Sequence, residues 1–348
     1  MFDEGRPMAV PPPPDDALSY EGLERLFASL NQASGIVAAV SGGPDSTALM
    51  HLLALWRAAG LRPPVLVATI DHGLRPDAVE EAAFVASEAG ALGLPHRTIA
   101  WMGDKPATGI QEAAREARYR LLADHAHAAG ASHLVTAHTL DDQAETVMMR
   151  LARGSGLSGL AGMRRETERH GLVHVRPLLG WPKARLLDLC RSQGWRFVED
   201  PSNANALYAR VRWRGLMPLL AAEGLDATRL ARFAERVARA EEALDLKAQE
   251  ALERAGLSGE GSPLAFDGSI LASEPFEIAL RVLEQALIGA GLGLENSRLN
   301  RIEAGVERLR EALGAGEPLS FTVAGALVRL DRAGRVTIRP EPPRRRGR

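Results

Sequence analysis

The chain has 348 residues, which is enough for more than one domain, because single hydrophobic cores rarely grow beyond roughly 250 residues. Its 46% hydrophobic and 25% charged residues are typical of a soluble globular protein, and its formal net charge of -2 excludes a strongly acidic or basic molecule as a whole. The single cysteine, Cys190, excludes an intramolecular disulfide, a zinc site made only of cysteines and an iron-sulfur cluster held by this chain alone.

Residues 1–16 come first, and we expect them to form a disordered leader, because four consecutive prolines beside acidic residues do not form a packed element. The leader lacks the pattern of a signal peptide. No apolar run in the chain approaches the roughly 18 residues that span a bilayer. We therefore expect a cytoplasmic protein with no membrane partner.

Short apolar strands then alternate with helices. We expect strands at 36–40, 65–70, 96–100 and 133–137, and helices at 46–59, 78–92, 110–129 and 142–153. Continuously apolar strands that alternate with helices predict an α/β fold with an open, mostly parallel sheet covered by helices on both faces. In such sheets, ligands bind beyond the carboxyl ends of the strands.

The alternation fades after residue 153, where glycines at 154, 156, 159 and 162 predict a flexible loop. Residues 150–214 contain thirteen Lys and Arg against five Asp and Glu, so this stretch carries +8 and the remainder of the chain -10. A local basic surface is typical of proteins that contact nucleic acid. A solvated arginine-rich face is the alternative.

A second, mainly helical unit is predicted beyond this stretch. We expect a long helix or helix pair over 219–255, helices over 274–289 and 297–313, and a β-hairpin within 319–338. These elements place a boundary near residue 215, which gives a domain over 17–215, a second over 216–340 and a basic tail at 341–348.

The segment between the first strand and its helix carries the strongest chemical signal. It consists of Ser41, Gly42, Gly43, Pro44, Asp45 and Ser46. Backbone N–H groups at a helix N-terminus bind anions, and glycines let the main chain approach a phosphate. The alternative is an ordinary turn with Asp45 or Ser46 as the N-cap.

Two further segments leave strands at the same edge of the predicted sheet. Residues 71–76 contain His72 and Arg75, and residues 137–146 contain Asp141, Asp142 and Glu145. These carboxylates can hold a metal ion on nucleotide phosphates, or they can simply cap a helix and complement its dipole.

The pattern Ser-Gly-Gly-x-Asp-Ser resembles the PP-loop of the N-type ATP pyrophosphatases. Over residues 35–220 the chain is similar to one such family, the tRNA(Ile)-lysidine synthetases. The segments that carry this resemblance are the loop, 71–76, the Arg-x-x-Arg-Tyr motif at 115–119, the His-x-x-Asp-Asp motif at 138–142, the glycine-rich run at 154–162, Arg176–Leu179 and 199–203.

The resemblance implies an ATP-dependent ligase. Such enzymes adenylate O2 of the wobble cytidine, position 34, in tRNA(Ile) with a CAU anticodon, and free L-lysine then displaces AMP to give lysidine. The implied cofactors are ATP and Mg²⁺, and the helical domain would bind substrate and tRNA. The oligomeric state stays open, with a homodimer as one option.

The resemblance also assigns the site residues. The nucleotide would bind to Ser41, Gly42, Gly43, Pro44, Asp45, Ser46, His72, Arg75 and Arg115, with Asp45 and Asp141 on the metal. The catalytic candidates are Asp45, Asp141, Asp142 and Glu145, of which Asp141 is the first candidate for the general base. The RNA-binding candidates are Arg150, Arg153, Arg210, Arg212 and Arg214.

One departure from the family is visible, and other functions are possible. Val211 stands where the family usually has an asparagine, and a valine cannot replace the hydrogen bonds of an amide. The rival readings are a tRNA thiolase, which the single cysteine argues against, and a non-catalytic protein that binds nucleotide and RNA. An amidotransferase synthetase lacks support, because no separate glutaminase region is present.

Overall fold

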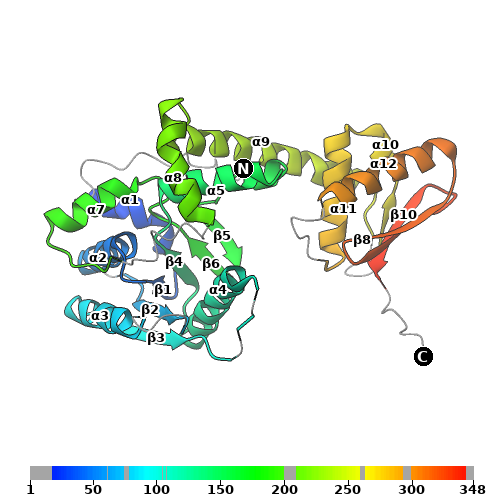
Figure 1. Cartoon of the computed structure of the whole chain (residues 1–348). Coiled ribbons are helices and arrows are strands. Elements are labelled where there is room, and N and C mark those ends of the chain that lie inside the picture. The colour runs from blue at the N-terminus through cyan, green and yellow to red at the C-terminus, as the bar shows by residue number, and fades with distance from the viewer. Residues whose placement is uncertain are drawn as a thin grey trace. The chain divides into compact units, whose positions relative to one another are not determined.

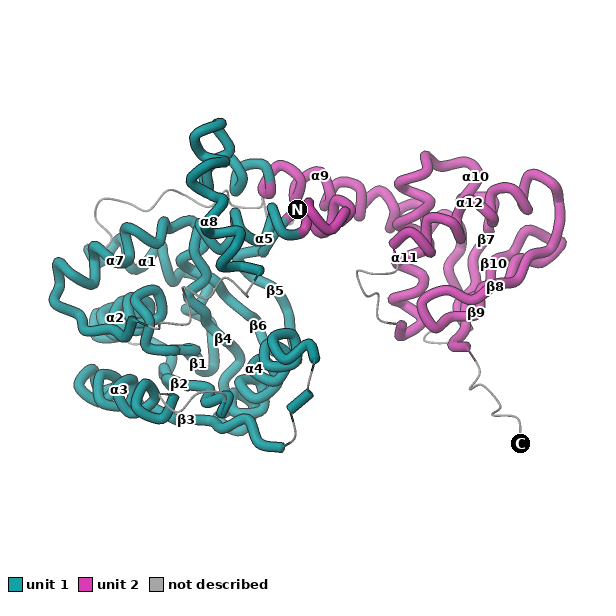
Figure 2. The backbone as a smooth tube through the Cα atoms, in the orientation of Figure 1, with its two compact units in different colours: residues 1–149, 162–233 teal, residues 150–161, 234–348 magenta. Residues whose placement is uncertain are grey.

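The computed structural model describes residues 18–60, 62–73, 78–103, 105–106, 108–199, 209–258, 263–292 and 299–341 (Figure 1). The chain divides into two compact units, the first made of residues 1–149 and 162–233 and the second of residues 150–161 and 234–348 (Figure 2). The predicted leader lies outside the described residues, as does the predicted tail apart from residue 341. The predicted boundary near residue 215 falls inside helix α8 (Ala209–Ala222) and stays a prediction.

A six-stranded sheet forms the centre of the first unit (Figure 1). Its strands are β1 (Ile36–Ala39), β2 (Val65–Asp71), β3 (His96–Ala100), β4 (His133–Thr136), β5 (Glu166–Arg169) and β6 (Leu172–Val175). Their order is β3-β2-β1-β4-β6-β5, and all neighbours run parallel except β5, which is antiparallel to β6. The predicted open, mostly parallel sheet is therefore confirmed.

Helices cover both faces of this sheet. They are α1 (Tyr20–Phe27) with a 3-10 turn (Ala28–Leu30), α2 (Pro44–Ala58), α3 (Ala78–Ala91), α4 (Ile110–Ala128) and α7 (Lys183–Ser192). Helices α5 (Leu140–Ala152) and α8 also belong largely to the first unit. In β1, Ile36 and Ala38 face a core shared with α1, α2, α3 and α7, whereas Val37 and Ala39 face a core shared with α4. A strand buried on both faces has to be apolar at every position, which explains the unbroken apolar run in the sequence.

Two features after residue 153 differ from the expectation. The predicted flexible loop contains a one-turn helix, α6 (Leu157–Leu160), and residues 166–175 form the unpredicted hairpin β5–β6. The hairpin turns at His170 and Gly171, which both have positive φ. Its outer strand is half exposed and polar, so it lacks the apolar run by which a buried strand is recognised.

The second unit contains helices and an antiparallel sheet. The helices are α9 (Ala227–Arg254), which begins in the first unit, α10 (Ser269–Ser273), α11 (Phe276–Gly289) and α12 (Leu299–Ala315). The strands are β7 (Leu264–Asp267), β8 (Leu319–Val323), β9 (Ala326–Leu330) and β10 (Arg335–Pro340), in the order β7-β10-β9-β8. The predicted hairpin is β9–β10, whose turn is closed by Asp331 as it accepts from the N–H groups of Ala333 and Arg335.

The hairpin belongs to a larger sheet than expected, because β7 and β8 pair with its two sides. Phe266 of β7, Leu283 of α11 and Val306 of α12 are fully buried in the core of this unit. Among the described helices, none combines the length and the apolar character that crossing a membrane requires.

Candidate functional site

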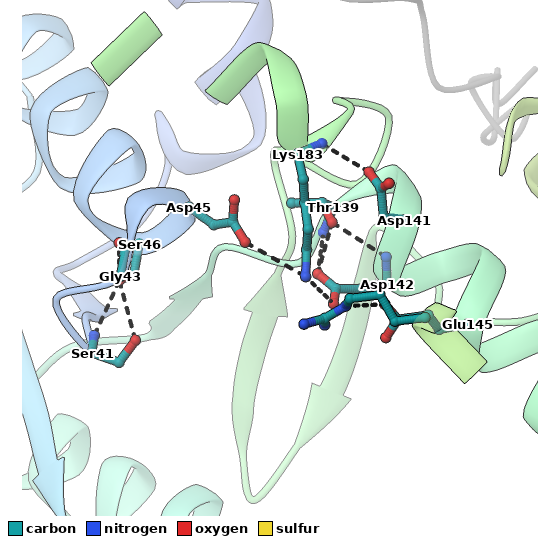
Figure 3. Close-up of polar contacts among 10 residues, drawn as sticks. Ser41, Gly43, Asp45, Ser46, Thr139, Asp141, Asp142, Glu145 and Lys183 are labelled. Atoms are coloured by element: carbon teal, nitrogen blue, oxygen red, sulfur yellow. Dashed lines mark hydrogen bonds and ion pairs between the residues drawn. The ribbon is translucent and has the colours of Figure 1, made fainter. Parts of the chain in front are cut away.

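The PP-loop lies between β1 and the first turn of α2 (Figure 3). Gly42 has a φ of +89°, a conformation that side chains disfavour, and Gly43 is the N-cap of α2. No side-chain hydrogen bond from a described residue caps this helix, so neither Asp45 nor Ser46 is the N-cap that the ordinary-turn alternative required. Ser46 instead holds the loop, since its hydroxyl donates to the Gly43 carbonyl at 3.0 Å and accepts from the Ser41 N–H at 3.2 Å.

This geometry leaves the N-terminal end of α2 available to an anion. The first N–H groups of a helix have no intrahelical partner, and the helix dipole makes this end positive. Ser41, Gly43 and Ser46 surround this end in Figure 3. The loop can therefore bind phosphate oxygens through its main chain.

Lys183 joins the carboxylates of two other elements (Figure 3). It is the first residue of α7, and its Nζ lies 3.1 Å from Oδ1 of Asp142 and 3.7 Å from Oδ2 of Asp45. Its backbone N–H donates to Oδ2 of Asp141 at 2.8 Å. One lysine thus contacts all three aspartates that the sequence singled out.

The two carboxylates that share the Lys183 ammonium differ in acidity. Burial raises the pKa of Asp45 to about 6, although Lys183 acts in the opposite direction. Burial opposes ionisation of Asp142 as well, but Lys183 and the Thr139 donors outweigh it and hold the pKa of Asp142 at about 2. The surroundings of Asp142 therefore favour its ionised form, whereas those of Asp45 favour its protonated form except for the cation beside it.

Asp142 also has the structural role that the sequence left open. Its Oδ2 accepts from the N–H and the hydroxyl of Thr139 at 2.9 and 2.8 Å, and its own N–H donates to the Thr139 hydroxyl at 3.2 Å. This reciprocal pair is a capping box at the start of α5. The remaining oxygen, Oδ1, faces Lys183, so capping and ligand binding use different atoms of one carboxylate.

Glu145 lies one turn further along α5 and is 1% exposed. Its Oε1 accepts from Nε of Arg214 at 2.9 Å, while Oε2 is buried and has no hydrogen-bond partner among the described residues. A buried carboxylate oxygen without a partner is costly. Arg214, predicted to bind RNA, instead lies against a catalytic candidate and is still 40% exposed.

The remaining nucleotide-binding candidates are less closely connected. His72 follows β2 and is half-buried, and burial lowers its pKa, with Arg118 acting in the same direction. Arg115 is exposed on α4, 5.2 Å from the ring of Tyr119, and no hydrogen bond or ion pair of the described residues joins it to the PP-loop. Arg75 lies outside the described residues.

The remaining arginine candidates for RNA binding fall in both units. In the second unit, Arg150 donates to the Gly159 carbonyl at 2.9 Å, so it stabilises the glycine-rich segment, and Arg153 is exposed. In the first unit, α8 carries Arg210, which is half-buried, and Arg212, which is exposed. Their roles stay predictions.

The donor set fits a divalent cation held together with phosphates. Within the described ranges, no group of three side chains forms a metal cage by itself. Mg²⁺ does not need one, because it usually binds through one or two carboxylates plus substrate phosphates. Asp45 and Asp142 already share one ammonium ion, whereas Asp141, the predicted partner of Asp45, accepts the Lys183 N–H instead.

Sequence reasoning missed Lys183 and Thr139. A lysine after Trp181-Pro182 at a helix start has no motif of its own, and only the packing of α7 beside α2 brings it to Asp45. The Thr139 cap had a recognisable signal, since Thr-x-x-Asp before a helix is a variant of the capping box.

Comparisons with known proteins agree on the fold and the family. Residues 18–220 match the family model described as a PP-loop domain. The chain is 50% identical over 349 residues to a tRNA(Ile)-lysidine synthase of Methylobacterium sp. (strain 4-46), covering 99% of this chain and 98% of that protein. It is 49% identical to a tRNA(Ile)-lysidine synthase of Rhodopseudomonas palustris, covering 95% and 97% of the two chains.

A solved structure supports the fold alone. The U34-tRNA thiolase NcsA from Methanococcus maripaludis, solved with its [4Fe-4S] cluster, aligns with a TM-score of 0.54 and 17% identity. The alignment covers 64% of this chain and 80% of the thiolase.

Proposed function

Because this chain belongs to the tRNA(Ile)-lysidine synthase family, we propose a role for each part of its site in the ATP-dependent ligation that forms lysidine on tRNA(Ile). The reaction has two steps. O2 of the wobble cytidine, position 34 of a CAU anticodon, first attacks the α-phosphate of ATP and releases pyrophosphate. The ε-amine of free L-lysine then attacks C2 and displaces AMP, because AMP is a far better leaving group than the original oxygen.

The first step uses the PP-loop and the aspartates near it. The N–H groups at the start of α2 bind the leaving pyrophosphate, where negative charge grows in the transition state. Asp45, together with Asp142 or Asp141, would hold Mg²⁺, whose positive charge stabilises that leaving group when the ion is bound. Lys183 keeps these carboxylates close together before the nucleotide arrives.

The second step needs a group that binds the lysine amine and accepts its proton. Asp141 is the candidate that the sequence put first, but it already accepts the Lys183 N–H. Oε2 of Glu145 is buried and has no hydrogen-bond partner in the part of the chain that the structure describes, so an amine placed against it would satisfy both the amine and this oxygen. We therefore place the substrate amine at Glu145 and assign the proton acceptance to its carboxylate.

The tRNA would be bound by the arginine candidates. Arg210 and Arg212 lie on α8, Arg150 lies in the last turn of α5, and Arg153 follows that helix. Arg214, a further candidate, already contacts Glu145. The anticodon loop is single-stranded, which is where sequence-specific RNA readers act. We further propose that the second unit contributes to tRNA binding and leave open whether two copies associate.

The uncapped PP-loop beside a Lys183-bridged aspartate pair is the observation that carries this proposal. The test incubates the full chain with ATP, Mg²⁺, labelled lysine and a tRNA(Ile) transcript with a CAU anticodon. We expect label on this tRNA and none on the same transcript with a UAU anticodon. Label that appears only with a sulfur donor, and not with lysine, would instead establish a thiolase.

The matched variant is Asp45→Asn, which keeps the size of the side chain and removes its charge. We expect it to stop pyrophosphate release while the circular dichroism spectrum is unchanged. An active Asp45→Asn chain would remove Asp45 from the site.

A further inference from the structure

A row of buried polar side chains runs from the Arg176 motif to the His-x-x-Asp-Asp motif. Nη2 of Arg176 lies 3.0 Å from Nδ1 of His174, and Nε2 of His174 lies 2.9 Å from Oγ1 of Thr136. The same Oγ1 lies 2.8 Å from Nδ1 of His138. The row crosses the two neighbouring strands β6 and β4, and all four residues are buried.

The direction of the first two hydrogen bonds follows from the arginine. A guanidinium group donates and never accepts, so Nδ1 of His174 is the acceptor and carries no proton. Burial lowers the pKa of His174 to about 3, which keeps this ring neutral with a single N–H. That N–H is therefore at Nε2, and it donates to the Thr136 hydroxyl.

The third hydrogen bond is directed by the threonine. Its oxygen could accept from both histidines, but the hydroxyl proton would then have no acceptor, because Thr136 is 1% exposed and the structure shows no other partner for this oxygen among the described residues. A buried donor without an acceptor is costly. The Thr136 hydroxyl thus donates to Nδ1 of His138.

His138 presents its other nitrogen to the site. The residue follows β4 directly, in the loop that leads to Asp142, and burial lowers its pKa well below the ordinary value. Nε2 makes no hydrogen bond with a described residue and is not one of the fully buried unpaired nitrogens. It is the end of the row that a ligand can reach.

We propose that Arg176, acting through His174 and Thr136, fixes His138 as the Nε2–H tautomer, a hydrogen-bond donor to the bound substrate at the carboxyl edge of β4. His138 then donates throughout the reaction and is excluded as the general base. Arg176, His174 and Thr136 are positioning residues. The contribution of His138 to the reaction rests on the proposed function, whereas the assignment of its tautomer does not.

The tautomer is measured on the full, ligand-free chain labelled with ¹⁵N-histidine, in long-range ¹H–¹⁵N spectra at neutral pH. The His138 signals are identified by their loss in His138→Gln. We expect a pyridine-type shift at Nδ1 and a pyrrole-type shift at Nε2. A pyrrole-type Nδ1 would overturn the proposal, and this result needs no variant that changes the row.

Thr136→Val and Thr136→Ser test the positioning role. The valine has a similar shape but no hydroxyl, so His138 should lose its single-tautomer pattern, and pyrophosphate release should slow by about tenfold, the effect of one hydrogen bond in the transition state. The serine keeps the hydroxyl and should restore both readouts. If a folded Thr136→Val chain has mixed His138 tautomers but releases pyrophosphate at the parent's rate, the positioning role is contradicted. A parent chain that never forms lysidine would contradict only the proposed function.

Discussion

Lys183 shows how the site is prepared before a nucleotide binds. Its ammonium lies between Asp45 and Asp142, two carboxylates that would otherwise repel each other in a half-buried position. The arrangement keeps both carboxylates next to the PP-loop. A residue that sequence reasoning overlooked is thus the one that holds the acidic groups together.

Lys183→Met should lower stability and make it depend on magnesium. Loss of the ammonium leaves Asp142 ionised without its partner, which costs about 1–2 kcal/mol for a partly exposed pair. Mg²⁺ should raise the melting temperature of this variant more than that of the parent, because the freed carboxylates bind it. Lys183→Arg keeps the charge and serves as the control. Equal effects of Mg²⁺ on variant and parent would argue against a metal at these aspartates.

Glu145→Gln should separate the two steps of the reaction. The amide can still accept from Arg214 but cannot take a proton from lysine, so lysine transfer should fall by roughly 10²-fold or more, a typical effect of losing a general base. Pyrophosphate release, measured separately, should continue. Glu168→Gln, at an exposed position on β5, is the matched control. Equal losses in both steps would show that Glu145 acts earlier than proposed.

The starts of helices α2 and α5 lie at the site, and they differ in how they are capped. Helix α2 begins without a side-chain cap from the described residues, so its first N–H groups are left to a ligand. Helix α5 begins with a capping box, in which Asp142 caps the helix through Oδ2 and faces Lys183 through Oδ1. Parallel strands place these two helix starts at the same edge of the sheet. The start of α2 is therefore open to an anion, whereas the start of α5 is closed by its own side chains.

Glu284, on helix α11 of the second unit, should make the free energy of unfolding depend on pH. Burial raises the pKa of Glu284 from 4.5 to about 7, so the folded chain holds a proton that the unfolded chain has released. The stability that this carboxyl contributes is fully present below about pH 4.5 and is lost as the pH rises through about 7.

Glu284→Gln removes this titration. Urea titrations measure the free energy of unfolding of the variant and the parent. As the pH rises from about 4.5 to about 7, the variant should become more stable relative to the parent. A difference that is constant with pH would show that Glu284 titrates normally.

For the whole molecule, charge is distributed unevenly along the chain. Residues 150–214 carry +8 while the remainder carries -10, so a nearly neutral chain contains a strongly basic segment. Part of that charge has internal partners, since Arg169 pairs with Glu116, and Arg214 with Glu145. Arg153 and Arg212 are exposed members of the segment, and they stay candidates for contacts with RNA.

Arg212→Ala should weaken tRNA binding and make the binding depend less on salt concentration. Each phosphate contact that is removed lowers the slope of log affinity against log salt by roughly 0.7 to 0.9, with similar loss for different tRNA sequences. Arg97→Ala, at an exposed position on the edge strand β3, should leave the slope unchanged. Salt titrations of tRNA binding measure both variants, and equal slopes would remove Arg212 from the RNA surface.

The sequence by itself determined the α/β sheet, the PP-loop and the family. These features are local: a strand buried on both faces has to be continuously apolar, and a phosphate-binding turn needs glycines at fixed positions next to a helix start. The roles of Val37 and Gly42 can therefore be predicted without knowing which residues they contact. The exposed, polar strand β5 has no such constraint and was missed.

Only the tertiary structure decided which groups meet. Lys183 is distant in sequence from Asp45, and His174 from Thr136, so no periodicity or spacing predicts that they touch. The choice of Glu145 over Asp141 likewise depends on which carboxylate oxygen lacks a partner. Hydrogen bonds and charges between distant segments are set by packing, and for that reason the sequence indicated the reaction, whereas only the structure shows which of the candidate residues lie together.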